Sequence, residues 1–163
     1  MPINVGGTIA GLDALGLRID GATRQATADA LHLFQAAGML NAPVGTPGNS
    51  TNAPGDLARS IDVEGPEGGD GVYAGEVGPT VVYGRQRELG GTIFKLDGFM
   101  HFFTDGGGHY AETVFGGGPE VFTHVVHQFG AHYMLRAWDD VMLSGSVEAV
   151  TEDRVAAAIL GAT

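Results

Sequence analysis

Three histidines near the end of the chain, His124, His127 and His132, are the residues best suited to metal chemistry. Neutral imidazole is a common zinc ligand, and the three side chains could converge if residues 121–133 formed one continuous helix. On a strand, however, His124 and His127 would point to opposite faces, and no His-Glu-x-x-His motif supports a helical zinc site. We therefore predict surface or hydrogen-bonded histidines and no metal site. A small metal-dependent hydrolase is the alternative from another class.

Other catalytic patterns are weaker still. The glycine-rich stretches 105–109 and 116–119 lack the Lys-Ser/Thr of a phosphate-binding loop, and no Gly-x-Ser-x-Gly elbow presents a serine nucleophile. Neighbouring carboxylates such as Asp139 and Asp140 diverge on a helix and cannot act as an acid/base pair. The chain has no cysteine, which excludes a thiolate nucleophile. The sequence predicts no catalytic residue, no cofactor and no enzyme activity.

Composition suggests one soluble domain with an acidic surface. The 163 residues fit a single domain, 1–163, and carry 19 acidic against 8 basic residues, a net charge of -11. This charge disfavours direct binding of nucleic-acid phosphates. Its favoured interpretation is solubility, and the alternative is that acidic subunits around a channel repel DNA and let it slide. No apolar stretch approaches the roughly 20 residues needed to cross a membrane, so we expect a soluble protein made in a cytoplasm.

The elements that would position any site begin with a long helix. Apolar residues spaced mostly by three or four predict a helix over 7–39, and Gly38, Asn41 and Pro43 supply stop signals. Glycines in its first half are expected to make it fray or begin as late as Asp20. A strand is predicted in the second half of 57–64, and the glycine-rich stretch 65–71 is expected to break it. Residues 72–77 and 80–83 are predicted to form two more strands or one bulged strand.

A glycine-rich insertion is predicted at 92–119. Asp97 and Gly98 separate two apolar runs, 92–96 and 99–104, which is typical of a hairpin, and a further strand is expected at 110–115. The aromatic residues Phe99, Phe102 and Phe103 belong to this insertion. They form either a local core under the hairpin or a contact surface for a neighbouring subunit.

Two helices are predicted to close the chain. Helical spacing indicates one over about 130–143, and Ser144 to Ser146 interrupt it. Thr151, followed by two acidic residues, predicts the start of a short terminal helix over 151–161. The fold class is therefore α+β, with a small antiparallel sheet packed against a long N-terminal helix and a C-terminal helix.

Short motifs occur in an order that resembles the tail-completion, or head-to-tail joining, proteins of long-tailed bacteriophages. The family has an Ala-Pro-Val-Asp-Thr-Gly-like turn after a long helix, then Leu-x-x-Ser-Ile, then a Tyr-Ala-x-x-x-Glu-x-Gly-like return strand and a helix opening near Phe-Leu-x-x-Ala. The matching pieces here are 42–47, 57–61, 82–90 and 133–137. Gly45 departs from the family's Asp in the turn.

The resemblance implies a structural virion protein, a minor tail protein that forms a ring of six subunits at the head-proximal end of the tail. Such a ring adjoins the tail terminator, docks on the connector or stopper of the head, and lets DNA pass without sequence-specific binding or contact with a membrane. The rivals within the virion are a tail terminator and a stopper ring. The resemblance also suggests 44–56 and 97–119 as docking elements. The candidate interface residues are Arg59, Arg85, Arg87, Glu88, Phe99, Phe102 and Phe103.

Overall fold

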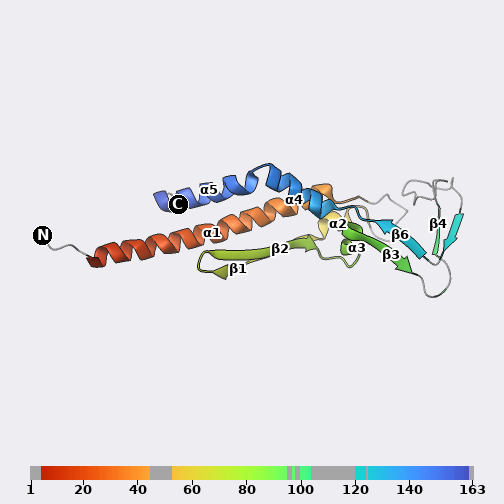
Figure 1. The fold of residues 1–163 in the computed structure, drawn as a ribbon, viewed down its shortest axis with the longest axis horizontal. Helices are drawn as coiled ribbons and strands as arrows, with labels where there is room; N and C mark the ends of the chain where they lie inside the picture. Colours follow the sequence, from red (N-terminus) through yellow and green to blue (C-terminus); the bar gives the residue numbers. More distant parts are fainter. Residues whose placement is uncertain are drawn as a thin grey trace.

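The computed structural model describes residues 5–44, 53–94, 97, 100–103, 120–123 and 125–161. Its central element is α1 (Val5–Asn41), which lies between a β-hairpin on one side and the two C-terminal helices on the other (Figure 1). Two further strand ladders lie at the end of the molecule that is far from the N-terminus. The predicted α+β fold class is confirmed.

Helix α1 is continuous, so the expectation that it would begin near Asp20 is wrong. Gly11, Gly16 and Gly21 interrupt the helical preference of its first half, but the helix still begins at Val5. A Cβ at any of these glycines would meet nothing within 4 Å, so packing does not require glycine there. Intrinsic propensity is a weak prior, and it does not fix where a helix starts. The predicted end is confirmed, because the helix stops at Asn41 and the Ala42 amide donates to the Gly38 carbonyl at 2.9 Å.

The first hairpin consists of β1 (Ile61–Gly69) and β2 (Val72–Pro79), paired antiparallel after the short helix α2 (Asp56–Arg59). The predicted break at 65–71 is wrong, because the strand continues to Gly69 through an irregularity between Glu64 and Glu67. The predicted strand at 80–83 is also wrong. A turn occupies those residues and leads into α3 (Gly84–Leu89), so the expected return strand over 82–90 is mostly helix.

Polar contacts fix this hairpin along α1. The Tyr73 hydroxyl and the Gly71 amide both donate to the Asp20 carboxylate at 2.7 Å. These two hydrogen bonds hold the pKa of Asp20 below its ordinary value of 3.8, and the bond from Tyr73 has the larger effect. Nearer the other end of the hairpin, the Gln35 side-chain amide donates to the Ile61 carbonyl at 2.9 Å. The hairpin is therefore held to the helix at both of its ends.

The remaining strands form an arm, defined here as β3 (Gly90–Phe94), β4 (Met100–Phe103), β5 (Glu120–Thr123) and β6 (Val125–Phe129). Strand β3 pairs with β6, and β4 pairs with β5, both antiparallel. The hairpin predicted to turn at Asp97 and Gly98 is therefore wrong, because 90–94 pair with 125–129 and not with 100–103. The strand predicted at 110–115 lies outside the described residues.

Two helices return antiparallel to α1. Helix α4 (Tyr133–Leu143) agrees with the predicted helix over 130–143, and α5 (Ser146–Leu160) follows the turn at Ser144 and Gly145. The predicted start of the last helix at Thr151 is wrong. Thr151 lies inside α5, where its hydroxyl donates to the Val147 carbonyl at 2.8 Å instead of capping a helix.

The buried cluster of the core lies where the end of α1, α2, the start of β1 and α4 meet. Its residues are Ala42, Leu57, Ile61 and Tyr133. Tyr133 is fully buried, and its hydroxyl donates to the Gly84 carbonyl at 3.3 Å. Burial, with smaller contributions from Glu88 and Tyr83, raises the pKa of Tyr133 to about 12. The phenol is therefore neutral at physiological pH and anchors α4 to the start of α3.

Candidate interaction surfaces

The four charged residues predicted for an interface lie on two short helices. Arg59 ends α2 and pairs with the Asp56 carboxylate of the same helix. Arg85 is exposed on α3, and Arg87, on the same helix, is half-buried. An exposed ion pair such as that of Arg59 contributes at most about 1 kcal/mol, so it remains available to a partner at little cost.

Glu88 has a role within the chain that the sequence did not reveal. Its carboxylate accepts hydrogen bonds from the amides of Met134 at 2.9 Å and Leu135 at 3.1 Å, the first residues of α4 after Tyr133. These are amides that a helix leaves unpaired at its N-terminus, and a negative charge is favoured there. Glu88 thus joins α3 to α4 and serves as a cap supplied from a distant part of the chain.

Two backbone hydrogen bonds join the segment between β6 and α4 to α3, at the place where the arm begins. The Ala131 amide donates to the Arg87 carbonyl at 2.7 Å, and the His132 amide donates to the Glu88 carbonyl at 3.1 Å. A Cβ on Gly130 would lie 2.4 Å from the Glu88 carbonyl oxygen, so this close approach requires glycine. The arm therefore leaves the body from a closely packed backbone junction.

The aromatic candidates belong to the arm or lie outside the described residues. Phe102 and Phe103 are in β4, opposite Val121 and Glu120 of β5, whereas Phe99 is not among the residues described. Residues 120–123 and 125–129 are strands, so the continuous helix that could gather the histidines over 121–133 does not form. His132 is exposed just before α4, and His124 is outside the described residues.

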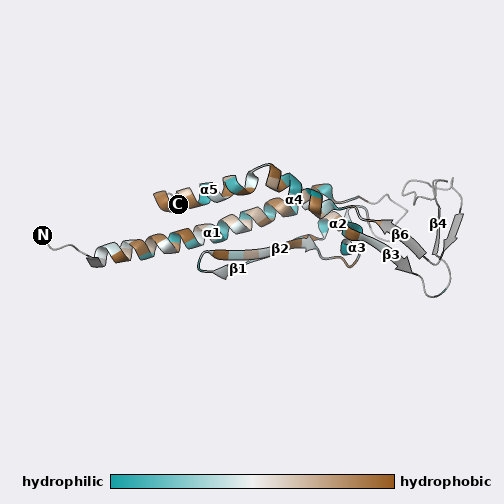
Figure 2. Cartoon of the chain, in the orientation of Figure 1, coloured by the Kyte–Doolittle hydropathy of each residue, from teal (hydrophilic) through white to brown (hydrophobic). Residues whose placement is uncertain are grey.

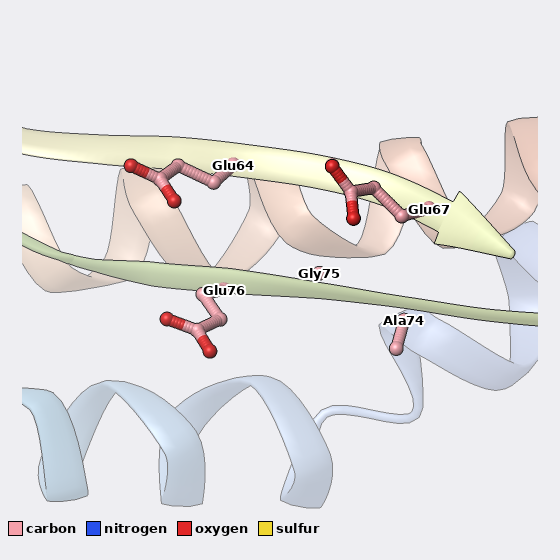
Figure 3. Close-up of a pocket in the computed structure, with 6 residues that line it drawn as sticks. Glu64, Glu67, Ala74, Gly75 and Glu76 are labelled. Carbon is pink, nitrogen blue, oxygen red and sulfur yellow. The ribbon is translucent and has the colours of Figure 1, made fainter.

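A hollow of about 290 Å³ lies on the first hairpin (Figure 3). Glu64 and Glu67 of β1 and Glu76 of β2 line it, and Glu64 pairs directly across the ladder with Glu76. Like charges opposite each other destabilise an antiparallel pair. Among the residues that the structure describes, no group of three or more His, Asp or Glu side chains is arranged to hold a metal ion, and this acidic hollow is no exception.

An apolar hollow of about 450 Å³, here called the aromatic groove, opens between α1, β2 and α4. Its apolar lining consists of Leu31, Phe34, Val77, Met134, Leu135 and Trp138. The rings of Phe34 and Trp138 stack with centroids 5.0 Å apart, yet Trp138 remains 53 % exposed. One feature of the sequence indicates this surface, which is that α4 carries apolar residues on two faces. Those at 133, 137 and 141 are buried, and those at 135, 138 and 142 are exposed.

The N-terminal end of α1 is also apolar and exposed. The first turns of α1 extend past the C-terminal end of α5 and past the turn of the first hairpin (Figure 1), and apolar colouring predominates along them (Figure 2). We call residues 9–17 the overhang. All of its residues are exposed except Leu15, which is half-buried. Ile9, Leu12 and Leu15, spaced by three, form one apolar ridge.

Comparison of the chain with protein-family models, with curated proteins and with solved structures finds no match. A search of the described helices for one long and apolar enough to cross a bilayer is negative.

Proposed function

We propose that the chain is a structural subunit of a long-tailed bacteriophage, which forms a ring, of six subunits, at the head-proximal end of the tail. The ring joins the tail to the connector of the head and continues the DNA channel. Its neighbours are further copies of itself, the tail terminator, and the connector or stopper protein. The acidic balance of the chain, with a net charge of -11, suits a channel through which DNA slides without being bound.

The observation that carries this proposal is the amount of apolar surface that the chain leaves uncovered. Among the described residues, Ile9, Leu12 and Leu17 of the overhang and Leu135, Trp138 and Met142 of α4 are exposed large apolar side chains. Large exposed apolar areas mark sites of protein association, and here they occur at the overhang and at the aromatic groove. A chain with two such surfaces at different places suits an assembly of repeated contacts.

The arm supports the same proposal. Among the described residues, each of its ladders, β3 with β6 and β4 with β5, consists of two strands. Two-stranded ladders are marginally stable alone, and open edges can pair with a strand of another protein. The order of motifs at 42–47, 57–61 and 133–137 adds the resemblance to tail-completion proteins.

The test is deletion of the gene from its phage, followed by negative-stain electron microscopy of the lysate, with expression from a plasmid as the control. Filled heads and tails of normal length that accumulate separately are the expected result. Overlong tails would instead indicate a tail terminator, and filled heads that leak DNA would indicate a stopper. Joined, infectious particles in the deletion strain would contradict a joining role.

A further inference from the structure

We propose that the aromatic groove binds a cationic amphipathic segment of another protein, which places apolar side chains in the groove and Lys or Arg side chains beside the carboxylates around it. The inference names the chemistry of one partner of the assembly, and in that sense it rests on the proposed function. The occupant is a different protein, because a second copy with a net charge of -11 would be repelled from a surface that already carries carboxylates.

Helix α4 carries more apolar surface than its packing on the body covers. Its face at 133, 137 and 141 is buried and attaches the helix to the rest of the chain. The second apolar face lines the groove, where Leu135 is 55 % exposed and Trp138, although stacked on Phe34, is 53 % exposed. Tryptophan is enriched at the energetic centre of protein contacts. This second face therefore has the properties of an association surface.

The groove has a suitable size for apolar side chains of a partner. Its volume of about 450 Å³ lies in the range of roughly 300–1,000 Å³ that is typical of ligand sites. A helix that binds in such a groove inserts apolar side chains spaced by three and four residues. These side chains release water from an apolar wall, to which α1 contributes Leu31 and Phe34.

The charge at the groove is negative. Among the described residues that line it, Glu88 is the one charged side chain and none is basic. Asp139 is exposed on α4, one turn after Leu135 on the same side of the helix. Arg136, the one basic residue of α4, lies about 160° around the helix from Trp138 at 100° per residue. A cationic segment is therefore favoured over an acidic one.

Further carboxylates lie beside the groove at β2. Gly75 lines both the groove and the acidic hollow of Glu64, Glu67 and Glu76 (Figure 3). Neighbouring Cα atoms are about 3.8 Å apart, and charges act over roughly 8 Å at physiological ionic strength, so these carboxylates add to the negative potential at that edge. The repulsion between Glu64 and Glu76, paired across the ladder, is reduced when a Lys or Arg of the partner approaches.

The fluorescence of Trp138 tests the binding directly, because it is the single tryptophan of the chain and lines the groove. The probe is a synthetic helical peptide of about 14 residues, or roughly four turns, with leucine on one face, lysine on the other and no tryptophan. We expect saturable binding that shifts the emission to shorter wavelength. The same peptide with glutamate in place of lysine should bind about tenfold more weakly or less. Equal affinities, or an unchanged emission with the lysine peptide, overturn the inference.

Two pairs of full-length variants separate the groove from the general attraction of an acidic protein. Leu135→Ala should weaken binding of the lysine peptide about fivefold or more, whereas Leu143→Ala, 88 % exposed at the end of the same helix, should not. Asp139→Asn should weaken it about threefold, whereas Glu152→Gln, exposed on α5, should not. Circular dichroism verifies that each variant folds. Equal effects within either pair contradict binding at the groove.

Photo-cross-linking identifies the occupant in the natural assembly. Leu135 is replaced by a photoreactive phenylalanine analogue, activated in phage-infected cells, and the cross-linked peptide is sequenced by mass spectrometry. The matched control carries the analogue in place of Val82, which is 99 % exposed and outside the groove. We expect a segment of another protein in which apolar residues recur every three or four positions beside Lys or Arg. An acidic segment, a second copy of this chain, or the same products as the control overturn the inference.

The two proposals fail in different experiments. If deletion of the gene leaves heads and tails unjoined but the lysine peptide binds no better than the glutamate peptide, the joining role stands and the groove does not select a cationic segment. If the lysine peptide binds at the groove but the deletion strain produces joined particles, the binding site stands and the joining role does not.

Discussion

The carboxylate of Glu88 accepts a hydrogen bond from the Met134 amide across 46 positions of sequence, and this contact joins the short helix before the arm to the helix after it. The same carboxylate accepts from Leu135, so one side chain satisfies two amides of the first turn of α4. The arm is inserted between the two partners of this contact. Its position on the body therefore depends on a residue that belongs to neither of its strand ladders.

Replacement of Glu88 by Ala should destabilise the body. Two amides at the N-terminus of α4 would lose their acceptor, and loss of such a cap costs about 1 to 2 kcal/mol of unfolding free energy. Urea unfolding followed by circular dichroism measures this change. Arg85→Ala on the same helix is the control, since an exposed substitution changes stability by within about 0.5 kcal/mol. Equal stability of the two variants would show that the carboxylate does not hold α4.

Gly75→Ala should also destabilise the chain, because the hairpin approaches α1 too closely for a side chain. A Cβ there would lie 2.4 Å from Leu31 Cδ1 and 2.6 Å from the Glu64 carbonyl oxygen. Overpacking of this kind costs about 1 to 3 kcal/mol, measurable as a lower urea midpoint. Gly78→Ala in the same strand meets nothing within 4 Å and serves as the matched control. A Gly75→Ala variant as stable as this control would contradict the packing.

Tyr73→Phe should weaken the dependence of stability on pH at the acid end. The Tyr73 hydroxyl is the first cause of the lowered pKa of Asp20, so the unfolded chain binds this proton at a higher pH than the folded chain. The stability from this contact is present above the ordinary value of 3.8 and is lost as pH falls through the lower folded pKa. The unfolding free energy should fall less between about pH 6 and about pH 2 in the variant than in the wild-type chain. Identical profiles would exclude the contribution of Tyr73.

Glu76→Gln should stabilise the first hairpin. Glu76 lies directly opposite Glu64 in the ladder, and removal of one charge from a like-charged pair gains about 0.2 to 1 kcal/mol. The gain should shrink in high salt, because both side chains are exposed and their repulsion is screened. Thermal unfolding at low and high ionic strength measures both effects. Glu152→Gln, exposed on α5, is the control, and an equal gain there would point to net charge as the cause.

The helices could be predicted because their signals are local. The apolar spacing of α1 and α4 and the stop at Asn41 all lie within a few residues of what they determine. Helix α3 carried such a signal as well, since Arg85, Gln86 and Arg87 are good helix formers, but the valines and the tyrosine before them favoured a strand. The strand predicted at 80–83 came from that β-branched run, whereas the return strand expected over 82–90 came from the resemblance.

Strand pairing and the groove could not be predicted from local patterns. Asp97 and Gly98 carry a strong short-range turn signal, but β3 pairs with β6 across more than 30 residues, and no spacing rule specifies such a partner. The aromatic groove requires Phe34 and Trp138 to stack between distant helices. The interface roles predicted for Arg59, Arg85, Arg87 and Glu88 stay predictions, and Glu88 also has a structural role at the α3–α4 junction.

The way in which the arm leaves the body determines how it would carry mechanical load. Both strands of the β3–β6 ladder begin at the same root, with Gly90 opposite Phe129, so tension applied beyond β4 and β5 loads the two strands in parallel. The ladder itself is then barely sheared. The force passes instead to the backbone bonds from Ala131 to Arg87 and from His132 to Glu88, where the chain is held to α3. The mechanical strength of the arm is therefore that of its anchorage, not of its own hydrogen-bond ladder.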